Sequence, residues 1–390
     1  MLDQSARDLL DLPENTDGCR IAVAMSGGVD SSLAAAICAE AGCDVFGLTL
    51  QLYNHGVSVG RSRACCAGQD IHDARRVADQ LQIPHYVLDY EERFRAAVID
   101  DFADTYAAGA TPVPCARCNE RVKFKDLLET AISLGAEFLV TGHYVASRSG
   151  KSGRTLHRAA DRERDQSYFM FTTTGKQLER LRFPLGDMTK KKTRELARGL
   201  SLSVADKPDS QDICFVPQGH YSSLVERLRP DAGEPGDIID IAGEVLGRHE
   251  GIARYTVGQR RGLGLATGEP LYVLRIDASK RQVVVGAHEE LEIHFIEIKD
   301  VNWIGQVQGM DVSASVMPVF VKIRSTQEPV AATFRISGKC AVVHFDKPEF
   351  GVSPGQACVV YDGSGAGARV LGGGWIDRCE GRGAQLGMVV

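Results

Sequence analysis

The stretch AMSGGVDSS (residues 24–32) sets two glycines and three serines between an apolar run and an alanine-rich segment. The apolar run, residues 20–25, predicts a short buried strand, and residues 33–40 predict a helix. Glycines in a strand-to-helix turn let the backbone approach an anion closely. The helix start adds unpaired N–H groups and the positive end of its dipole. The stretch therefore predicts a phosphate-binding loop.

Two common phosphate-binding patterns do not match this loop. No lysine follows the glycines as in G-x-x-x-x-G-K-[ST], and the spacing G-x-G-x-x-G is absent. A glycine turn that only caps a helix is the alternative interpretation. The full S-G-G-x-D-S run at the start of alternating strands and helices favours a nucleotide instead. Because a carboxylate at Asp30 beside a polyphosphate is costly without a cation, Mg²⁺ is expected as well.

Length and composition predict a globular protein of two or three domains, since the chain has 390 residues and is 44% hydrophobic. No uncharged apolar stretch of about 18 residues is present, so we expect no membrane span. The acidic N-terminal segment lacks the apolar core of a secretory signal and the arginines of a transit peptide. We therefore expect a cytoplasmic protein, in which eleven cysteines do not form a secreted disulfide framework.

The net charge of −6 gives no general attraction to nucleic acids. Two local basic segments, TKKKTRELAR (residues 189–198) and GQRRGLG (residues 258–264), are candidates for contacts with an RNA backbone. The alternative for each is a solvated basic surface.

Strands and helices are expected to alternate up to about residue 215, which predicts a parallel sheet with its ligand at the carboxyl ends of the strands. Besides residues 20–25, the expected strands are 44–52, 84–89 and 136–142, and the further helices are 68–82, 91–107 and 118–134. Beyond about residue 285, short alternating strands predict a small β-barrel or sandwich. The expected domains are 1–220, 221–286 and 287–390.

The segment TPVPCARCNERVKFK places Cys115 and Cys118 at C-x-x-C spacing where a helix is expected to begin. A helix N-terminus, with Arg117 and Arg121 nearby, predicts a lowered thiol pKa and a nucleophile at neutral pH. A zinc half-site is the alternative, but no second pair completes the ligands. Cys214, in KPDSQDICFV, is another candidate for thiol chemistry. The cysteines expected to be small buried apolar side chains are Cys19, Cys38, Cys43, Cys340, Cys358 and Cys379.

In sequence order, seven motifs together resemble the tRNA-specific 2-thiouridylase family: AMSGGVDSS, PCARCNERVKFK, TGHYVA, RDQSYFM, PDSQDICFV, YTVGQRRGLG and SPGQACVVY. The resemblance covers nearly the whole chain. It implies an α/β parallel-sheet ATP pyrophosphatase domain of the adenine nucleotide alpha hydrolase-like type, a small central tRNA-contacting module and a C-terminal β-barrel. It also implies replacement of the 2-oxygen of the tRNA wobble uridine by sulfur, with ATP split into AMP and pyrophosphate.

The family's functional residues map onto this chain by position. ATP contacts are implied for Ala24, Met25, Ser26, Gly27, Gly28, Val29, Asp30, Ser31, Ser32, Leu50 and Gly142. Leu50 replaces a methionine that is common in the family, a nearly isosteric change. Contacts with tRNA are implied for Val113, Pro114, Cys115, His143, Arg164, Asp165, Gln166, Arg324, Ser325 and Gln356. Ser325 stands where relatives carry an aromatic residue, so stacking on RNA is not expected there.

The implied chemistry needs both a phosphate loop and thiols. The uracil oxygen attacks the α-phosphate of ATP, so that AMP becomes a leaving group, and sulfur then replaces it. By resemblance, Cys214 receives a persulfide from a sulfur-carrier protein. Cys118 either attacks as a nucleophile or reduces the persulfide to release sulfide. The two thiols end as a disulfide that must be reduced in every turnover.

The base-contacting turn departs from the family pattern. Many members carry T-P-N-P-D-x-x-C, whereas this chain reads TPVPCARC. The amide and carboxylate that would bind uracil are replaced, and a third thiol, Cys115, is present. Cys115, Cys118 and Cys214 can therefore alternatively hold a [4Fe–4S] cluster that carries the sulfide, in the same overall reaction.

Two other function classes account for part of the sequence. A pyrophosphatase-loop ligase acting on a small molecule would need the loop but neither Cys118 nor Cys214. A non-catalytic RNA-binding protein with a metal or cluster site would release no pyrophosphate. Release of pyrophosphate that depends on tRNA separates these alternatives.

Overall fold

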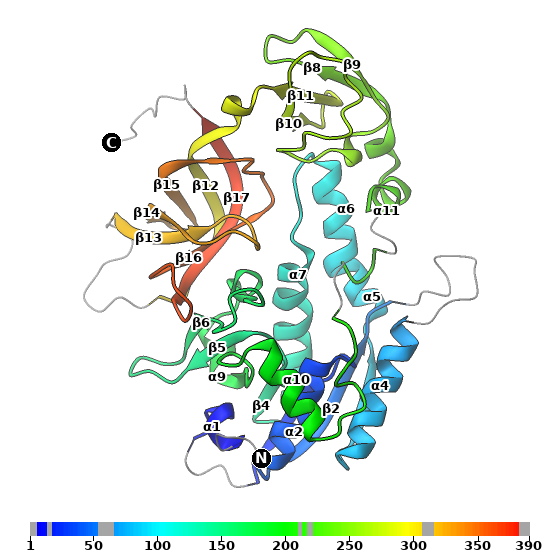
Figure 1. Cartoon of the computed structure of the whole chain (residues 1–390), viewed down its shortest axis with the longest axis vertical. Helices are drawn as coiled ribbons and strands as arrows, with labels where there is room; N and C mark the ends of the chain where they lie inside the picture. Colours follow the sequence, from blue (N-terminus) through cyan, green and yellow to red (C-terminus); the bar gives the residue numbers. More distant parts are fainter. Residues whose placement is uncertain are drawn as a thin grey trace.

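The computed structural model describes residues 6–13, 18–53, 66–209, 213–216, 221–305 and 316–381. Figure 1 shows an α/β body at one end, a small β module at the other, and a β-barrel beside the helices that join them. Cys65 and residues 1–5 and 14–17 of the N-terminal acidic segment lie outside the described residues. Within the described ranges, no helix is both long and apolar enough to cross a bilayer.

The α/β body is built on a five-stranded sheet of order β3-β2-β1-β4-β7, whose neighbouring strands all pair in parallel. Its strands are β1 (Arg20–Ala24), β2 (Asp44–Gln51), β3 (His85–Asp89), β4 (Phe138–Thr141) and β7 (Leu181–Arg182). Central strands that are apolar along most of their length are typical of a parallel sheet covered on both faces. The predicted parallel sheet is confirmed.

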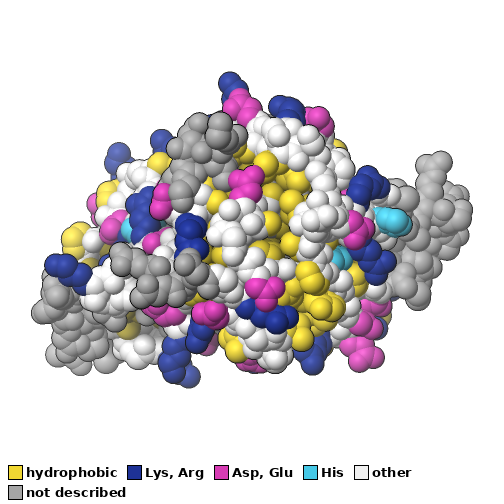
Figure 2. Space-filling model, turned by 90° about the horizontal axis from the view of Figure 1, so that it is seen from below, with side chains coloured by type: hydrophobic (Ala, Val, Ile, Leu, Met, Phe, Trp, Pro, Cys, Tyr) yellow, Lys and Arg dark blue, Asp and Glu magenta, His cyan; other side chains and the backbone are white. Residues whose placement is uncertain are grey.

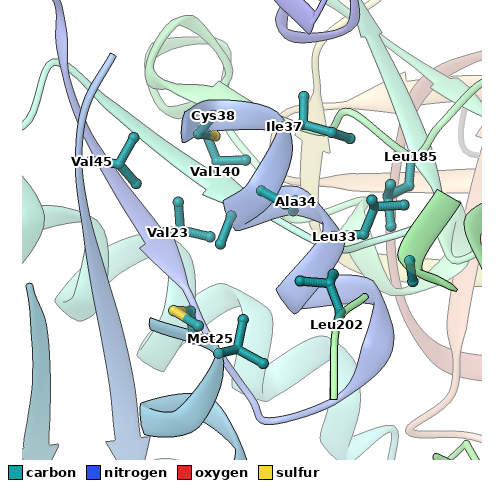
Figure 3. Close-up of a cluster of buried hydrophobic side chains, with 14 of the residues drawn as sticks. Val23, Met25, Leu33, Ala34, Ile37, Cys38, Val45, Val140, Leu185 and Leu202 are labelled. Atoms are coloured by element: carbon teal, nitrogen blue, oxygen red, sulfur yellow. The ribbon is translucent and has the colours of Figure 1, made fainter. Parts of the chain in front are cut away.

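One face of the sheet is covered by helix α2, whose alanines allow a close approach to the strands (Figure 3). Val23 and Val140 of the sheet belong to the same core cluster as Leu33 and Ile37 of α2. The helices that contact α2 are α1 (Ala6–Leu10), α4 (Cys66–Gln80) and α10 (Lys190–Gly199). Because α2 runs over Val29–Glu40, it begins four residues earlier than predicted. The last residues of the phosphate loop therefore form the first helical turn.

The opposite face of the sheet is covered by a long helical segment with a π-helical stretch in its middle. The segment comprises α7 (Pro114–Arg117), the π-helical stretch η2 (Cys118–Leu127) and α8 (Leu128–Ser133). A similar segment comprises α5 (Glu91–Phe94), the π-helical stretch η1 (Arg95–Ile99) and α6 (Asp100–Ala107). The sequence predicted both helices but not their π-helical stretches, which are frequent at functional sites.

The central module has a four-stranded sheet of order β10-β11-β8-β9. Helix α11 (Tyr221–Leu228) precedes β8 (Gly236–Ile239), β9 (Val245–His249), β10 (Tyr272–Asp277) and β11 (Gln282–Gly286). Its apolar residues share one core with the second helical segment. Phe215 lies between Phe94 and Phe102, with ring centroids 5.7 and 5.2 Å away. This packing fixes the chain directly after Cys214.

The C-terminal barrel closes because β12 pairs with both β15 and β17. Its strands are β12 (Glu292–Trp303), β13 (Met317–Lys322), β14 (Val330–Ser337), β15 (Cys340–Phe350), β16 (Ala357–Tyr361) and β17 (Arg369–Gly381). A hairpin from the α/β body, β5 (Val145–Arg148) and β6 (Thr155–Arg158), pairs with β17 and extends the sheet. The remaining described helix is α9 (Gly175–Arg180). The sequence did not predict β12 or the hairpin.

A buried ion pair fastens this hairpin to the barrel. Arg158 Nε lies 2.8 Å from Asp165 Oδ2, and both side chains are only 1% exposed. Arg158 also donates to the carbonyl of Ser364, and Lys322 of the barrel lies 3.8 Å from the same carboxylate. The Asp165 carboxylate, implied above as a tRNA contact, is therefore enclosed between two parts of the protein.

We expect Asp165→Ala to lower the free energy of unfolding by about 3 to 5 kcal/mol, because it leaves the Arg158 guanidinium buried without its partner. Asp187→Ala is the matched control, since the Arg148–Asp187 pair is 48% and 64% exposed, and should cost less than about 1 kcal/mol. Urea denaturation followed by fluorescence measures both. Equal stability of the two variants would contradict a structural function of Asp165.

Candidate active site

The phosphate loop follows β1 and has a shape that glycine alone permits. Gly27 has φ +74°, and a Cβ there would lie 2.1 Å from the carbonyl oxygen of Asp70. Gly28 precedes α2 and provides no side-chain cap. The N–H groups of the first helical turn therefore stay available for an anion.

Hydroxyl groups hold the loop in one conformation. The Ser26 N–H donates to Ser31 Oγ over 3.1 Å, and Ser31 Oγ donates to the Gly28 carbonyl over 3.2 Å. Ser32 Oγ donates to the same carbonyl over 2.8 Å. The loop is thus organised by its own side chains.

Gly142, at the end of β4, lies against this loop. A Cβ on Gly142 would be 2.6 Å from the carbonyl carbon of Asp30 and from the nitrogen of Ser31. Leu50 is half-buried at the end of β2. The residues predicted to contact ATP are therefore brought together at the carboxyl edge of the sheet, where ligands bind in such folds.

Asp30 is held by a lysine that the sequence analysis did not identify. Lys190 Nζ lies 2.7 and 2.8 Å from the two oxygens of Asp30, and the Tyr144 hydroxyl donates to Asp30 over 3.2 Å. Lys190 begins α10, within the basic segment that we considered for RNA contacts. No sequence spacing signals this contact, because Lys190 and Asp30 meet only through the fold.

A second carboxylate, Asp209, shares Lys190 with Asp30. Lys190 Nζ lies 2.8 Å from Asp209, and the guanidinium groups of Arg164 and Arg194 each lie 2.9 Å from it. Burial alone would raise the pKa of Asp209, but the hydrogen bond from Lys190 and the three positive charges hold this pKa below its usual value. Asp209 therefore stays ionised and binds basic groups from two segments.

Lys207 attaches α4 to the phosphate loop. Its ammonium donates to the Gly27 carbonyl over 3.0 Å and to the carboxylates of Asp70 and Asp73 over 2.7 and 2.6 Å. Like Lys190, this lysine was not predicted as part of the site. Each of the two lysines therefore joins the loop to carboxylates from other segments.

The three candidate thiols come from two segments and influence one another electrostatically. Cys118 is buried, whereas Cys115 and Cys214 are exposed. Desolvation, then the neighbouring Cys118 and Cys115, raises the pKa of Cys214 to about 12. Lys123 opposes the shift at all three thiols, and it follows Cys118 by one π-helical turn. Lys123 is a further site residue that sequence analysis missed.

The predicted lowering of the thiol pKa is wrong for both Cys115 and Cys118, because burial raises each pKa. Cys118 is buried and also lies beyond the first turn of a helix that starts at Pro114, so the helix N-terminus does little to offset the effect of burial. The two arginines expected to favour a thiolate are engaged elsewhere. Arg117 and Arg121 contact Asp101 at 3.5 and 2.9 Å.

His143 lies between the phosphate loop and the thiols. Its Nδ1 is 2.8 Å from Thr141 Oγ1, and its ring packs edge-on against Phe124 and Phe183 at 5.8 and 6.4 Å. Burial, and then the charge of Lys123, holds the His143 pKa well below its usual value. His143 is therefore neutral at neutral pH and presents no charge to a bound base.

Apart from these thiols, the cysteines only partly follow the prediction of burial. Cys19, Cys38 and Cys358 are buried, and Cys43 and Cys379 are half-buried. Cys340 is exposed, since it lies at the start of β15, directly after the turn from β14. In the part of the chain that the structure describes, no three His, Cys, Asp or Glu side chains are arranged to hold a metal ion.

The barrel positions the loop that precedes Cys115. The Thr111 N–H donates to the Pro354 carbonyl over 2.8 Å, and the Thr111 and Ser353 hydroxyl groups are 2.7 Å apart. The SPGQ turn, which carries Gln356, is thereby fixed beside the buried Val113. The other implied tRNA contacts of this region are Pro114, Cys115, Arg324 and Ser325, of which Pro114 is buried, Arg324 and Ser325 are half-buried and Cys115 is exposed.

The implied contacts of the RDQ triplet divide between surface and interior. Arg164 is 41% exposed and reaches Asp209, while Asp165 is buried. Gln166 is half-buried, and its side-chain oxygen accepts the N–H of Tyr144 over 2.8 Å. The end of the molecule that carries α1, α2 and α4 shows acidic and basic side chains interspersed around apolar ones (Figure 2), so this end has no uniformly basic surface for RNA.

A parallel sheet with an anion-binding loop at its carboxyl edge defines a nucleotide-binding α/β protein of the HUP class. Residues 19–218 match the family model described as tRNA methyl transferase HUP domain. Residues 223–287 match the tRNA methyl transferase PRC-barrel domain, and residues 293–376 the aminomethyltransferase beta-barrel domain.

Curated relatives cover nearly the whole chain. The tRNA-specific 2-thiouridylase MnmA of Parvibaculum lavamentivorans is 59% identical over 95% of this chain and 94% of its own length. That of Rhodopseudomonas palustris (strain ATCC BAA-98 / CGA009) is 60% identical over 94% of this chain and 93% of its own length. The chain belongs to the tRNA-specific 2-thiouridylase family, which confirms the resemblance. Among solved structures, the NMN synthetase of Francisella tularensis aligns with 53% of this chain and 74% of its own, at 18% identity and a TM-score of 0.32.

Gly142→Ala should weaken ATP binding by about tenfold or more, because the added methyl group displaces the first turn of α2. Gly175→Ala is the matched control, since no atom lies within 4 Å of its Cβ position. Calorimetric titration with ATP measures both variants, and circular dichroism checks their folding. Wild-type affinity in folded Gly142→Ala would contradict the placement of the nucleotide.

Alkylation of Cys214 by iodoacetamide should accelerate about tenfold per pH unit from pH 7 to pH 9 without a plateau, because a raised pKa keeps the thiolate scarce. Lys123→Gln should slow alkylation of Cys118 at fixed pH, since the lost ammonium otherwise lowers the pKa of that thiol. The exposed neighbour Lys125→Gln is the control. Peptide mass spectrometry reports each rate, and a plateau near pH 7 would contradict the raised pKa.

Proposed function

We propose that this protein uses ATP to replace the 2-oxygen of the tRNA wobble uridine by sulfur. The observation that carries this proposal is that residues 142–143 lie against both the phosphate loop and the helical segment with the candidate thiols. Gly142 touches the loop, and His143 contacts the helical segment that carries Cys118 and Lys123. Membership of the 2-thiouridylase family supports the same reaction.

In the first half-reaction, the loop binds the pyrophosphate portion of ATP. The uracil 2-oxygen attacks the α-phosphorus, and pyrophosphate leaves as the bond between the α- and β-phosphates breaks. N–H groups at the start of α2 and the ammonium groups of Lys190 and Lys207 stabilise the departing negative charge. Asp30 is the carboxylate suited to hold Mg²⁺, which would neutralise part of the phosphate charge when bound.

In the second half-reaction, sulfur displaces AMP from carbon 2. The exposed Cys214 is accessible to a sulfur-carrier protein, which leaves a persulfide on it. The terminal persulfide sulfur attacks carbon 2, and AMP departs with the former uracil oxygen. The buried Cys118 then attacks the Cys214 sulfur, which releases the thiocarbonyl base and forms a Cys118–Cys214 disulfide. An external thiol reductant restores both thiols.

Lys123 would favour the anionic sulfur species in this sequence. Its ammonium lowers the pKa of Cys118 and Cys214 against the effect of burial. Among the described residues, no hydrogen bond or ion pair engages the ammonium of Lys123. Its charge is therefore available to the thiols and to the departing AMP.

The alternative [4Fe–4S] route does not fit the side chains as they are placed. Cys115, Cys118 and Cys214 influence one another electrostatically, but they are not arranged as ligands of a common metal in the described part of the chain. We therefore derive no step through a cluster. Cys214 is exposed and can receive sulfur from a carrier, whereas Cys118 is buried. This difference suits a transfer of sulfur that uses the two thiols in turn.

Other reactions are less compatible with the site. The matching family models carry the description tRNA methyl transferase, but methyl transfer requires neither a pyrophosphate loop nor a group of thiols. A ligase acting on a small molecule would use the loop and leave Cys118 and Cys214 without a function. Neither alternative accounts for both halves of the site.

We infer that tRNA lies across all three parts of the chain. In this proposal residues 1–220 carry the chemistry, 221–286 form the central module and 287–390 form the barrel domain. The proposed RNA contacts are Val113, Pro114, Cys115, His143, Arg164, Gln166, Arg324, Ser325 and Gln356, while the enclosed Asp165 supports them by holding Arg158. A tRNA substrate is consistent with a cytoplasmic location.

The wild-type protein should form AMP from ATP only when substrate tRNA is present. Cys118→Ala and Cys214→Ala should each reduce 2-thiouridine formation by about 100-fold or more, while AMP formation falls much less, because adenylation precedes sulfur transfer. Cys340→Ala, which removes an exposed thiol of the barrel, is the control. Chromatography of digested tRNA and of nucleotides measures the two products.

Iron analysis distinguishes the two sulfur routes. Protein purified without oxygen should be colourless and active with a persulfide donor. A brown, active protein with about four irons per chain would contradict the two-thiol route and support the cluster. ATP turnover that ignores RNA would contradict the proposed function altogether.

A further inference from the structure

A chain of charged groups runs from the phosphate loop to the protein surface. Asp30 lies 2.7 Å from Lys190, Lys190 lies 2.8 Å from Asp209, and Asp209 lies 2.9 Å from Arg164. The exposed fraction of the side chain is 31% at Asp30, 11% at Lys190, 15% at Asp209 and 41% at Arg164. Of the two cations in this chain, Arg164 is therefore the more accessible to an approaching phosphate.

Lys190 is placed between two competing carboxylates. Its single ammonium contacts both oxygens of Asp30 and one oxygen of Asp209 at nearly equal distances. Asp209 in turn divides its negative charge among Lys190, Arg164 and Arg194. Loss of a cation from Asp209 removes a positive charge that repels Lys190, which favours a shift of the Lys190 ammonium from Asp30 toward Asp209.

The surrounding backbone keeps these groups in register. Asp161 accepts the backbone N–H of Lys190 over 2.8 Å, and Arg164 N–H donates to the Asp161 carbonyl over 3.1 Å. The turn that carries Arg164 is therefore attached to the start of α10. A second connection joins Gln166 to Tyr144, whose hydroxyl donates to Asp30.

We propose that Asp209 is a positioning residue that couples RNA binding at Arg164 to the freeing of Asp30 in the nucleotide site. The inference rests on the proposed function, which places tRNA phosphate near Arg164. When an RNA phosphate takes Arg164, Asp209 loses that partner and draws Lys190 toward itself. Asp30 then loses its ammonium partner and becomes available to the magnesium-bound nucleotide.

The coupling must be reciprocal, because the two ligands act on one equilibrium. RNA should raise the affinity for magnesium nucleotide, and nucleotide should raise the affinity for RNA by the same factor. The protein would in this way bind ATP productively only beside its RNA substrate, which limits wasteful hydrolysis.

The test measures the affinity for magnesium α,β-methylene ATP, which cannot be cleaved at the reacting bond, with and without a tRNA transcript that the wild type thiolates. The wild type should bind the nucleotide analogue about fivefold or more tightly with RNA, within the usual range of coupling. Asp209→Asn should bring this ratio close to one. Asp206→Asn is the matched control and should keep the wild-type ratio. Asp206 forms an exposed ion pair with Arg198, which lies on α10 together with Lys190.

A second variant distinguishes the proposed coupling through Asp209, the relay, from simple misfolding. Arg164→Gln removes one cation from Asp209, so it should bind the analogue several-fold more tightly than the wild type without RNA. A misfolded protein would not gain affinity. An unchanged ratio in Asp209→Asn, a ratio of one in the wild type, or weaker binding by Arg164→Gln would each overturn the relay. Failure of the proposed function is distinct, since no transcript would then be thiolated by the wild type.

Discussion

The close approach of the first turn of α2 to the end of β4 is the constraint on which the site depends. Only glycine at position 142 leaves room for the backbone of Asp30 and Ser31. This contact aims the helix N-terminus along the carboxyl edge of the sheet. It also places His143 directly beside the loop, and through His143 the helical segment that carries the thiols. Phosphate chemistry and sulfur chemistry therefore share one short stretch of backbone.

Electrostatics in this site is arranged by contacts between distant segments. The loop itself contributes one carboxylate, and its positive charge comes from Lys190 and Lys207, far away in the sequence. The thiols lie in surroundings that favour their neutral forms, with Lys123 as the opposing charge. Thiols in such surroundings stay mostly protonated at neutral pH, which slows their oxidation.

The sequence predicted the parts of the fold that have local signals. Apolar runs marked the strands of the parallel sheet, and the glycine-serine stretch marked the anion-binding loop. The hairpin β5–β6 was missed because its partner strand lies more than 200 residues away. Lys190, Asp209 and Lys123 were missed for a similar reason, since their partners are set by tertiary packing. The lowered pKa predicted for Cys118 was wrong because helix position is visible in sequence, whereas burial and the engagement of Arg117 by Asp101 are not.

The sharing of one sheet by two parts of the chain has a consequence for how this protein can be divided. Strand β6 completes its hydrogen bonding on β17, and the guanidinium of Arg158 finds acceptors in both the body and the barrel. Cutting the chain between them would leave a bare strand margin on the body and would remove the barrel carbonyl that accepts from Arg158, so that only Asp165 would hold this guanidinium. The barrel is therefore not a detachable RNA-binding accessory, and insertions or gene fusions are tolerated better at the outer turns of the central module than at the seam between these two parts.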